Sequence, residues 1–316
     1  MDTTTNAAPV EDVRKISRQL IDEFAEAPQG EIKNASAAGT NMIRRKIREN
    51  GFLRRILPPE NKTNEDLDRV VDHDRPLIIE EMEPSSKGAK SMPFGDSAES
   101  QSFYGNKFQV VFNQITTPEF TKDINELRTY RGDVRQVVTD NALKDVQTEE
   151  DGQFIAGVDT TCGSSSGVGL AGVQQSFLIP GGITRDNYVD ALSKLEDLDL
   201  NNGVFLMNRK TAKQFLKWTR DEIGGDLAQD LFKEGLSALQ EATIMGVKHI
   251  FTIKRNLVAD NIVYMFGEPN FLGKFYILQD LCMFVEKKKD ILRFSARETI
   301  GTSIANVNAV AKCNFA

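Results

Sequence analysis

The sequence contains little of what catalytic and metal sites are built from. It has two histidines, His73 and His249, and three cysteines, Cys162, Cys282 and Cys313, in 316 residues. Imidazole is a common metal ligand and the usual acid–base group near neutral pH. Two distant histidines therefore exclude a multi-histidine metal centre and make a catalytic triad hard to build. The cysteines share no CxxC spacing and are odd in number, which predicts free thiols in a reducing compartment.

Long apolar runs and excess positive charge are also missing. No run approaches the roughly 18 residues that a transmembrane helix needs, and the polar segment Met1–Pro9 lacks a signal-peptide pattern. We therefore expect a soluble, unsecreted protein with no membrane partner. The 39 Lys and Arg against 46 Asp and Glu give a net charge of −7, which argues against a dedicated nucleic-acid binder. A 40% hydrophobic content in a chain of 316 residues predicts a globular protein of about two domains, or one with large appendages.

Two narrow apolar stripes at helical spacing mark the N-terminal region, one in 10–27 and one in 42–57. Short helices with one thin apolar face cannot fold alone, so each stripe needs a partner surface on this chain or another. Basic residues surround the second stripe. They form either an ordinary charged helix face or a contact for phosphates or an acidic neighbour.

A hairpin with a very long loop is predicted next. Residues 76–82 and 108–115 have the apolar pattern of strands. Between them lie about twenty residues rich in Ser, Gly and Lys, with a turn at Phe94, whereas hairpin loops usually have two to five. We expect an extended, protruding loop with a role of its own.

One long helix and a mixed region follow. Pro118 suits the first turn of a helix, Thr117 suits its N-cap, and apolar spacing predicts that this helix runs from 118 to about 146. Helices and strands alternate over 174–267, and strand follows strand from 274 onward. Strands joined by tight turns, with one long helix upstream, predict an α+β fold.

Three local motifs are weak as chemical sites. Gly167–Gly172 matches GxGxxG, but no strand leads into its first glycine and no helix follows, so a flexible linker is the better interpretation. Cys162 has no nearby histidine to act as its base. His249 alternates with apolar neighbours, which predicts a half-buried strand residue. We expect no catalytic residue, no cofactor, no metal site and no enzyme activity.

The order of the elements is itself recognisable. An arm, a long hairpin loop, a helix that ends in Glu-Asp-Gly-x-Phe-Ile-x-Gly (Glu150–Gly157), an α/β middle and C-terminal strands follow one another. Shorter matches are Val204–Thr211, Met245–Val247 and Ala305–Val310. Over nearly the whole chain this order resembles the major capsid protein of tailed bacteriophages, whose Hong Kong ninety-seven type fold is shared with encapsulins.

The resemblance implies an α+β capsid fold of five parts. They are an N-terminal arm (1–64), an extended loop with its β-hairpin base (65–117), a spine helix with peripheral domain (118–173), an axial domain (174–267) and C-terminal strands of the peripheral domain (268–316). The implied function is self-assembly as hexamers and pentamers into an icosahedral virion shell around phage double-stranded DNA, with assembly in the host cytoplasm. The implied partners are other copies, a scaffolding protein and a portal, with a decoration protein left open and only non-specific proximity to DNA.

Candidate intersubunit contacts follow from the same resemblance. The basic arm residues are expected to pair with acidic faces of the next copy, and the loop tip to lie over a neighbour. These residues are Arg44, Arg45, Arg48, Arg54, Arg55, Lys87, Lys90 and Phe94. Some family members cross-link a loop lysine to an asparagine in the C-terminal strands. No asparagine lies between Asp290 and Ala305, so we expect non-covalent locking.

Two alternatives to a phage capsid stay open from the sequence. One is an encapsulin-like nanocompartment shell that holds an enzyme cargo instead of a genome. The other is a small-molecule enzyme that uses the glycine-rich loop. The long arm and the extended loop favour the phage capsid.

Overall fold

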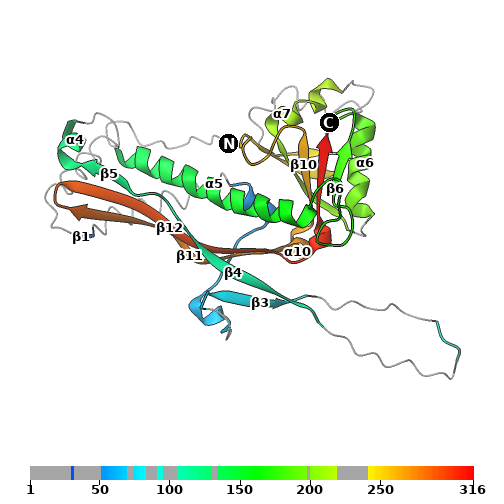
Figure 1. The fold of residues 1–316 in the computed structure, drawn as a ribbon, viewed down its shortest axis with the longest axis horizontal. Coiled ribbons are helices and arrows are strands. Elements are labelled where there is room, and N and C mark those ends of the chain that lie inside the picture. Colours follow the sequence, from blue (N-terminus) through cyan, green and yellow to red (C-terminus); the bar gives the residue numbers. More distant parts are fainter. Residues whose placement is uncertain are drawn as a thin grey trace, which may run out of the picture.

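The molecule consists of two sheets joined by one long helix, with a hairpin that projects from the larger sheet (Figure 1). The computed structural model describes residues 30–31, 51–69, 74–82, 91–94, 105–129, 134–197, 200–218 and 241–316. None of the described helices is long and apolar enough to cross a membrane. Separate helices beside largely antiparallel sheets confirm the predicted α+β class.

The larger sheet has seven strands and is organised around one long hairpin. The strands are β1 (Gly30–Glu31), β2 (Glu60–Asn61), β3 (Leu77–Glu81), β4 (Lys107–Thr116), β5 (Phe120–Asp123), β11 (Gly273–Lys288) and β12 (Ile291–Ile304). β11 and β12 pair antiparallel from Gly273↔Ile304 to Lys288↔Ile291. β12 also pairs with β4 and β5, and β4 pairs with β3. The projecting hairpin, predicted from 76–82 and 108–115, is thereby confirmed and rooted in this sheet.

The smaller sheet has six strands in the order β6-β13-β10-β7-β9-β8. They are β6 (Ser176–Ile179), β7 (Asn202–Asn208), β8 (Glu241–Ile244), β9 (Val247–Thr252), β10 (Ile262–Gly267) and β13 (Val310–Phe315). Alternate residues of the central strands face opposite sides, as the period of two in a strand requires. Phe205 and Met265 pack with α6 (Arg185–Glu196) and α7 (Arg209–Ala212), whereas Leu206 and Phe266 share a core with α5 (Val134–Cys162).

The long helix α5 connects the two sheets through one continuous core. It runs along the larger sheet and ends beside the smaller one (Figure 1). Val146 and Phe154 of α5 are buried in the same cluster as Phe294 of β12 and Phe266 of β10. The rings of Phe154 and Phe266 lie 5.5 Å apart. Because both sheets share this core, they are held in one packed body.

The helix predicted over 118–146 is wrong in its first part and too short at its end. Residues from 120 form β5, a short helix α4 (Ile124–Thr129) follows, and α5 continues to Cys162. Thr117 is not an N-cap: its N–H donates to the Ala296 carbonyl and its Oγ1 accepts from the Ala296 N–H, each at 2.9 Å. These two hydrogen bonds to β12 continue the sheet through Thr117, so strand pairing overrides the local helical pattern.

The end of the predicted arm is part of the protein's own core. Helix α3 (Leu53–Ile56) follows Phe52 and precedes Leu57. The four apolar side chains here are no more than 3% exposed; they are Phe52, Leu53, Ile56 and Leu57. They join the cluster that also contains α5 and β12. The sequence leaves open whether this stripe is covered by its own chain or another; for residues 52–57, its own chain covers it. The stripe over 10–27 and the first part of the second stripe lie outside the described residues.

Truncating Leu53 tests this placement of the arm root. Leu53→Ala is expected to lower the free energy of unfolding by roughly 2–5 kcal/mol, because it leaves a cavity at a fully buried position. Urea unfolding followed by circular dichroism measures the change. Leu178→Ala, at a position that is 57% exposed, is the matched control and should change it by less than about 0.5 kcal/mol. Equal effects of the two substitutions would place the arm root outside the core.

Candidate assembly surfaces

A buried ion cluster joins the arm root, the long helix and the larger sheet. The Arg54 guanidinium on α3 donates through Nη2 to Glu150 Oε1 of α5 and to Glu298 Oε1 of β12, each at 2.6 Å. Its Nε donates to Glu150 Oε2 at 3.2 Å. The Arg54 side chain is 6% exposed and both carboxylates are fully buried. One arginine therefore fixes three segments that are far apart in the sequence.

The next residue of α5 extends the cluster toward the smaller sheet. Asp151 accepts the Leu53 N–H at 3.0 Å and the Lys254 ammonium at 2.6 Å. Lys254 lies just after β9 and also donates to the Gln147 carbonyl at 3.0 Å. The adjacent acidic pair in α5 thus holds the start of α3 on one side and the β9 end of the smaller sheet on the other.

The charges of this cluster balance only if one carboxyl keeps its proton. Three carboxyls, Glu150, Asp151 and Glu298, face two cations, Arg54 and Lys254. Burial and then the charge of Glu150 raise the pKa of Glu298 to about 8, against the attraction of Arg54. Burial also raises the pKa of Asp151. Glu298 therefore holds its proton at neutral pH.

The cluster corrects one predicted contact residue. The sequence predicts that Arg54 reaches an acidic face of the next copy, but its guanidinium donates hydrogen bonds to two carboxyl groups of its own chain. Arg55 is 16% exposed and lies 3.8 Å from Glu241 of its own chain. Phe94 is fully exposed. The remaining predicted contact residues lie outside the described residues and stay predictions. They are Arg44, Arg45, Arg48, Lys87 and Lys90.

His249 and Cys162 are both buried and uncharged near neutral pH. His249 is fully buried, so the half-buried position expected from its sequence pattern is wrong. Its Nδ1 donates to the Val247 carbonyl at 2.8 Å, so Nε2 accepts from the Tyr188 hydroxyl. Burial lowers the pKa of His249 to about 4, which keeps the ring neutral. Burial likewise raises the pKa of the Cys162 thiol to about 12, so a thiolate does not form near neutral pH.

The glycine-rich loop stands in the wrong context for a dinucleotide. Gly167–Gly172 follows helix α5 and precedes strand β6, whereas the dinucleotide turn follows a strand and precedes a helix. Within the described ranges, no group of three or more His, Cys, Asp or Glu side chains could hold a metal ion.

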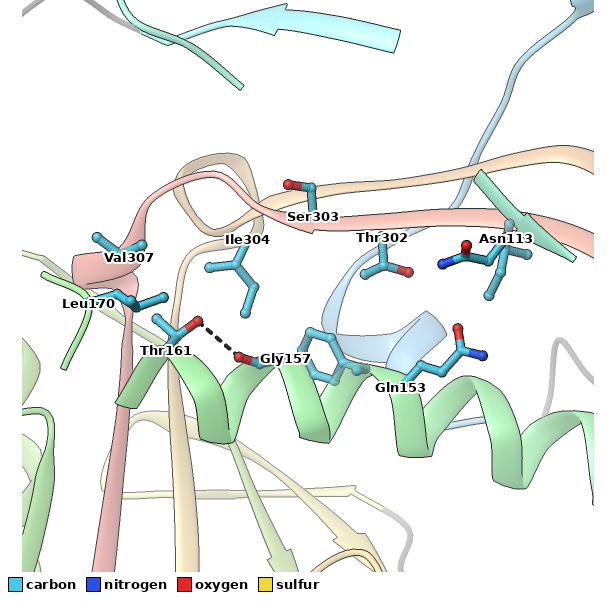
Figure 2. Close-up of a pocket in the computed structure, with 11 residues that line it drawn as sticks. Asn113, Gln153, Gly157, Thr161, Leu170, Thr302, Ser303, Ile304 and Val307 are labelled. Carbon is cyan, nitrogen blue, oxygen red and sulfur yellow. Dashed lines mark hydrogen bonds between the residues drawn. The ribbon is translucent and has the colours of Figure 1, made fainter. Parts of the chain in front are cut away.

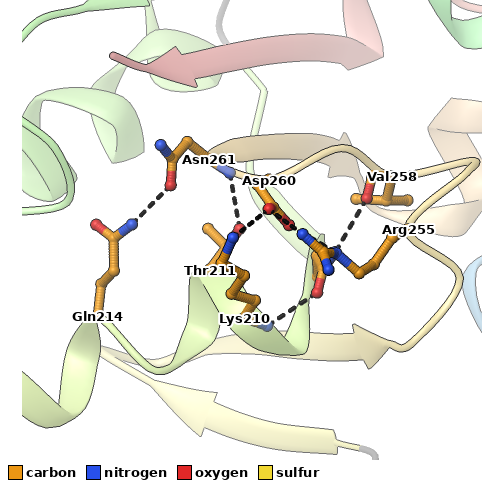
Figure 3. A network of polar contacts seen from close by, with 8 residues as sticks. Lys210, Thr211, Gln214, Arg255, Val258, Asp260 and Asn261 are labelled. Atoms are coloured by element: carbon orange, nitrogen blue, oxygen red, sulfur yellow. Dashed lines mark hydrogen bonds and ion pairs between the residues drawn. The ribbon is translucent and has the colours of Figure 1, made fainter.

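A surface clamp fixes the start of α7 (Figure 3). Asp260, in the loop before β10, accepts hydrogen bonds from Lys210 at 2.6 Å and Asn208 at 3.2 Å, and pairs with Arg255. Asn208 also caps α7 by accepting the Lys210 N–H at 2.8 Å. Lys210 and Arg255 remain 64% and 58% exposed. The clamp holds the helix to the sheet while leaving two cations on the surface.

Two further features of the surface have no partner among the residues that the structure describes. The first is the segment 91–94, which belongs to the projecting hairpin loop and lies well away from both sheets (Figure 1). The second is a groove of about 320 Å³ between α5 and the end of β12 (Figure 2).

Comparison with known proteins decides what kind of molecule carries these surfaces. The sequence model described as the Phage capsid family matches residues 36–315. The chain belongs to the phage capsid family. A search of curated proteins finds no match.

Solved structures agree on the fold. The capsid of an empty GTA particle superposes with a TM-score of 0.58 at 15% identity, over 84% of this chain and 89% of that chain. The mature capsid of bacteriophage PhiM1 gives 0.57 at 8% identity, over 84% and 87%. The virus-like particle from Pyrococcus furiosus gives 0.53 at 13% identity, over 88% and 98%. At such identities these likenesses show the fold, which is the predicted Hong Kong ninety-seven type.

Family and fold together confirm the predicted role. The chain is a major capsid protein of an icosahedral phage shell, and the encapsulin-like alternative is not favoured. Both the family and the fold are those of a structural protein.

The pH dependence of stability tests the shared proton in the ion cluster. Glu298 has a pKa raised from 4.5 to about 8 by folding, so its stabilising proton is fully present below pH 4.5 and is lost as the pH rises through 8. The free energy of unfolding should therefore fall between pH 6.5 and 8.5, and Glu298→Gln, which mimics the protonated carboxyl, should flatten this fall. Urea titrations at several pH values measure it.

The chosen pH window separates Glu298 from the buried histidine and the buried cysteines. His249, with a lowered pKa, changes stability only below its ordinary value of 6.5, and the buried cysteines act only above 9. Glu149→Gln, which removes an exposed carboxyl of α5 next to Glu150, is the control and should leave the slope unchanged. A wild-type stability that is flat across this window would contradict the shared proton.

Proposed function

We propose that the chain assembles as hexamers and pentamers into an icosahedral shell that encloses phage double-stranded DNA. The observation that carries the proposal is the family match over residues 36–315. The net charge of −7 supports it, because an acidic container does not hold the phosphate backbone tightly. The shell then belongs to the virion, with assembly in the host cytoplasm.

The architecture suggests a division of labour within each copy. We assign α5 and the larger sheet to a peripheral domain, and the smaller sheet with α6 and α7 to an axial domain around the five- and six-fold axes. Residues 1–64 and 65–117 supply the arm and the extended loop. The inert His249 and Cys162 support a protein without catalytic activity or cofactor. A scaffolding protein and a portal are proposed partners, and a decoration protein is a further option.

Contacts between copies are proposed at the arm and the loop tip. Arg44, Arg45 and Arg48 would face acidic surfaces of the next copy, with Arg55 beside them. Lys87, Lys90 and Phe94 would lie on a neighbour from the loop. The absence of an asparagine between Asp290 and Ala305 supports locking without a covalent bond.

Assembly of the purified chain tests the proposed function directly. Mass photometry and negative-stain microscopy over a range of concentrations should show pentamers and hexamers or closed shells. Such species are expected because the exposed loop segment has no partner among the described residues of its own chain. A chain that stays a stable monomer or dimer at every concentration would contradict the proposal.

Shortening the extended loop tests its role in assembly. Replacing residues 84–102 by a four-residue Gly-Ser turn should leave the fold intact, because β3 and β4 keep their pairing. Assembly should be lost while circular dichroism and the urea midpoint stay unchanged. A matched variant keeps the length of 84–102 but contains only Gly and Ser, and it should also fail if the side chains make the contact. Normal shells from the shortened chain would refute the role of the loop.

A further inference from the structure

Phe94 is the most exposed large apolar side chain in the described part of the chain. Its exposed fraction is 110%, against 71% for Ile253, the next most exposed. The segment 91–94 lies well away from both sheets (Figure 1), and the exposure of the ring shows that it packs against none of the described helices and strands. Burying a phenylalanine side chain is worth roughly 1.5–3 kcal/mol, and a ring left in water forgoes that gain unless a partner covers it.

A groove suited to such a ring lies on the same chain, between α5 and β12 (Figure 2). It has a volume of about 320 Å³. Buried Phe154 and Ile300 line its apolar part, and Gly157 leaves the α5 wall without a side chain. A Cβ added at Gly157 would meet no atom within 4 Å, so the space in front of this wall is open. The polar side chains that line the groove are Asn113, Gln153, Thr161, Thr302 and Ser303.

We propose that Phe94 of one copy inserts into this groove of a second copy. The inference rests on the proposed shell-forming function and names the contact that the loop tip makes. A benzyl side chain is smaller than the groove, and the accessible apolar side chains of Leu170, Ile304 and Val307 in its lining can cover the ring. The amides and hydroxyls of the lining can bond the backbone of residues 91–93, where Pro93 has no N–H to satisfy.

A second copy fits this groove better than an unrelated partner does. Ring and groove are different surfaces of one chain, so every copy offers one of each and the two halves are always present in equal number. Such a contact is heterologous: it does not close within a pair but passes from copy to copy into rings or larger assemblies. A shell built from one chain requires contacts of this kind.

Two substitutions remove the contact from opposite sides. Phe94→Ala deletes the ring. Gly157→Leu fills the groove, and it should fold well because leucine favours a helix over glycine by about 1 kcal/mol and meets open space here. The matched controls are Ser91→Ala in the same loop segment and Ala156→Leu, an exposed neighbour in α5 that does not line the groove.

The threshold concentration for assembly is the measured quantity. Each of Phe94→Ala and Gly157→Leu should raise it roughly tenfold or more, as expected for loss of one buried aromatic contact, with an unchanged urea midpoint. Both controls should assemble like the wild type. If the wild type forms shells and both test variants do so equally well, this inference is overturned and the proposed function stands. If the wild type forms no assembly, both are overturned.

Cysteine cross-linking locates the contact and identifies the copies involved. In a Cys282→Ser background, chains with Phe94→Cys are mixed with chains that carry Gln153→Cys. A disulfide-linked dimer is expected, because Gln153 lines the groove. Asp145→Cys, exposed on the same helix but outside the groove, replaces Gln153→Cys as the control and should give no dimer. Equal dimer yields, or a disulfide that forms only within a doubly substituted chain, would overturn the proposal.

Discussion

The relative position of the arm root, the long helix and both sheets depends on the buried ion cluster around Arg54. Arg54 reaches Glu150 and Glu298, and the neighbouring Asp151 reaches Leu53 and Lys254. Apolar packing in the shared core holds the same elements together but is not directional. The ion cluster sets how they register, because its hydrogen bonds are made only at particular distances and angles.

The energetics of such a cluster explain its role. Removing two ions from water costs several kcal/mol each, so a buried pair adds little net stability over a well-packed apolar substitute. Losing one member is costly, because the others are then buried without compensation. The cluster therefore penalises wrong arrangements of α3, α5 and β12 more than it stabilises the right one. A shell subunit needs that property, since small errors in the angle between its sheets would accumulate from copy to copy.

Much of the fold could be predicted from periodicity and order. The hairpin strands, the alternating helices and strands of the middle region and the C-terminal strands follow from local pattern. The order of these elements along the chain is the basis of the resemblance to capsid proteins. The predictions that were wrong concern residues whose partners are distant in the sequence. Thr117 belongs to the sheet because of Ala296, and Arg54 turns inward because of Glu150 and Glu298, which lie 96 and 244 residues away. Local pattern contains no information on such pairs, so it predicts a surface charge for any basic residue on a short amphipathic stripe.

The same limit applies to the candidate assembly surfaces, with one instructive difference. The exposed Phe94 could be identified from sequence because a long polar loop between two strands has no core in which to bury an aromatic ring. The groove could not be identified from sequence, because its walls come from α5, β4, β12 and the glycine-rich loop. It is open at Gly157, where glycine has no side chain to fill it. The interior is thus fixed by contacts that penalise error, while the surface offers an apolar contact of only a few kcal/mol. That separation suits assembly from many copies: a rigid subunit meets its neighbours through contacts weak enough to break singly, so a wrongly placed copy can leave before others lock it in.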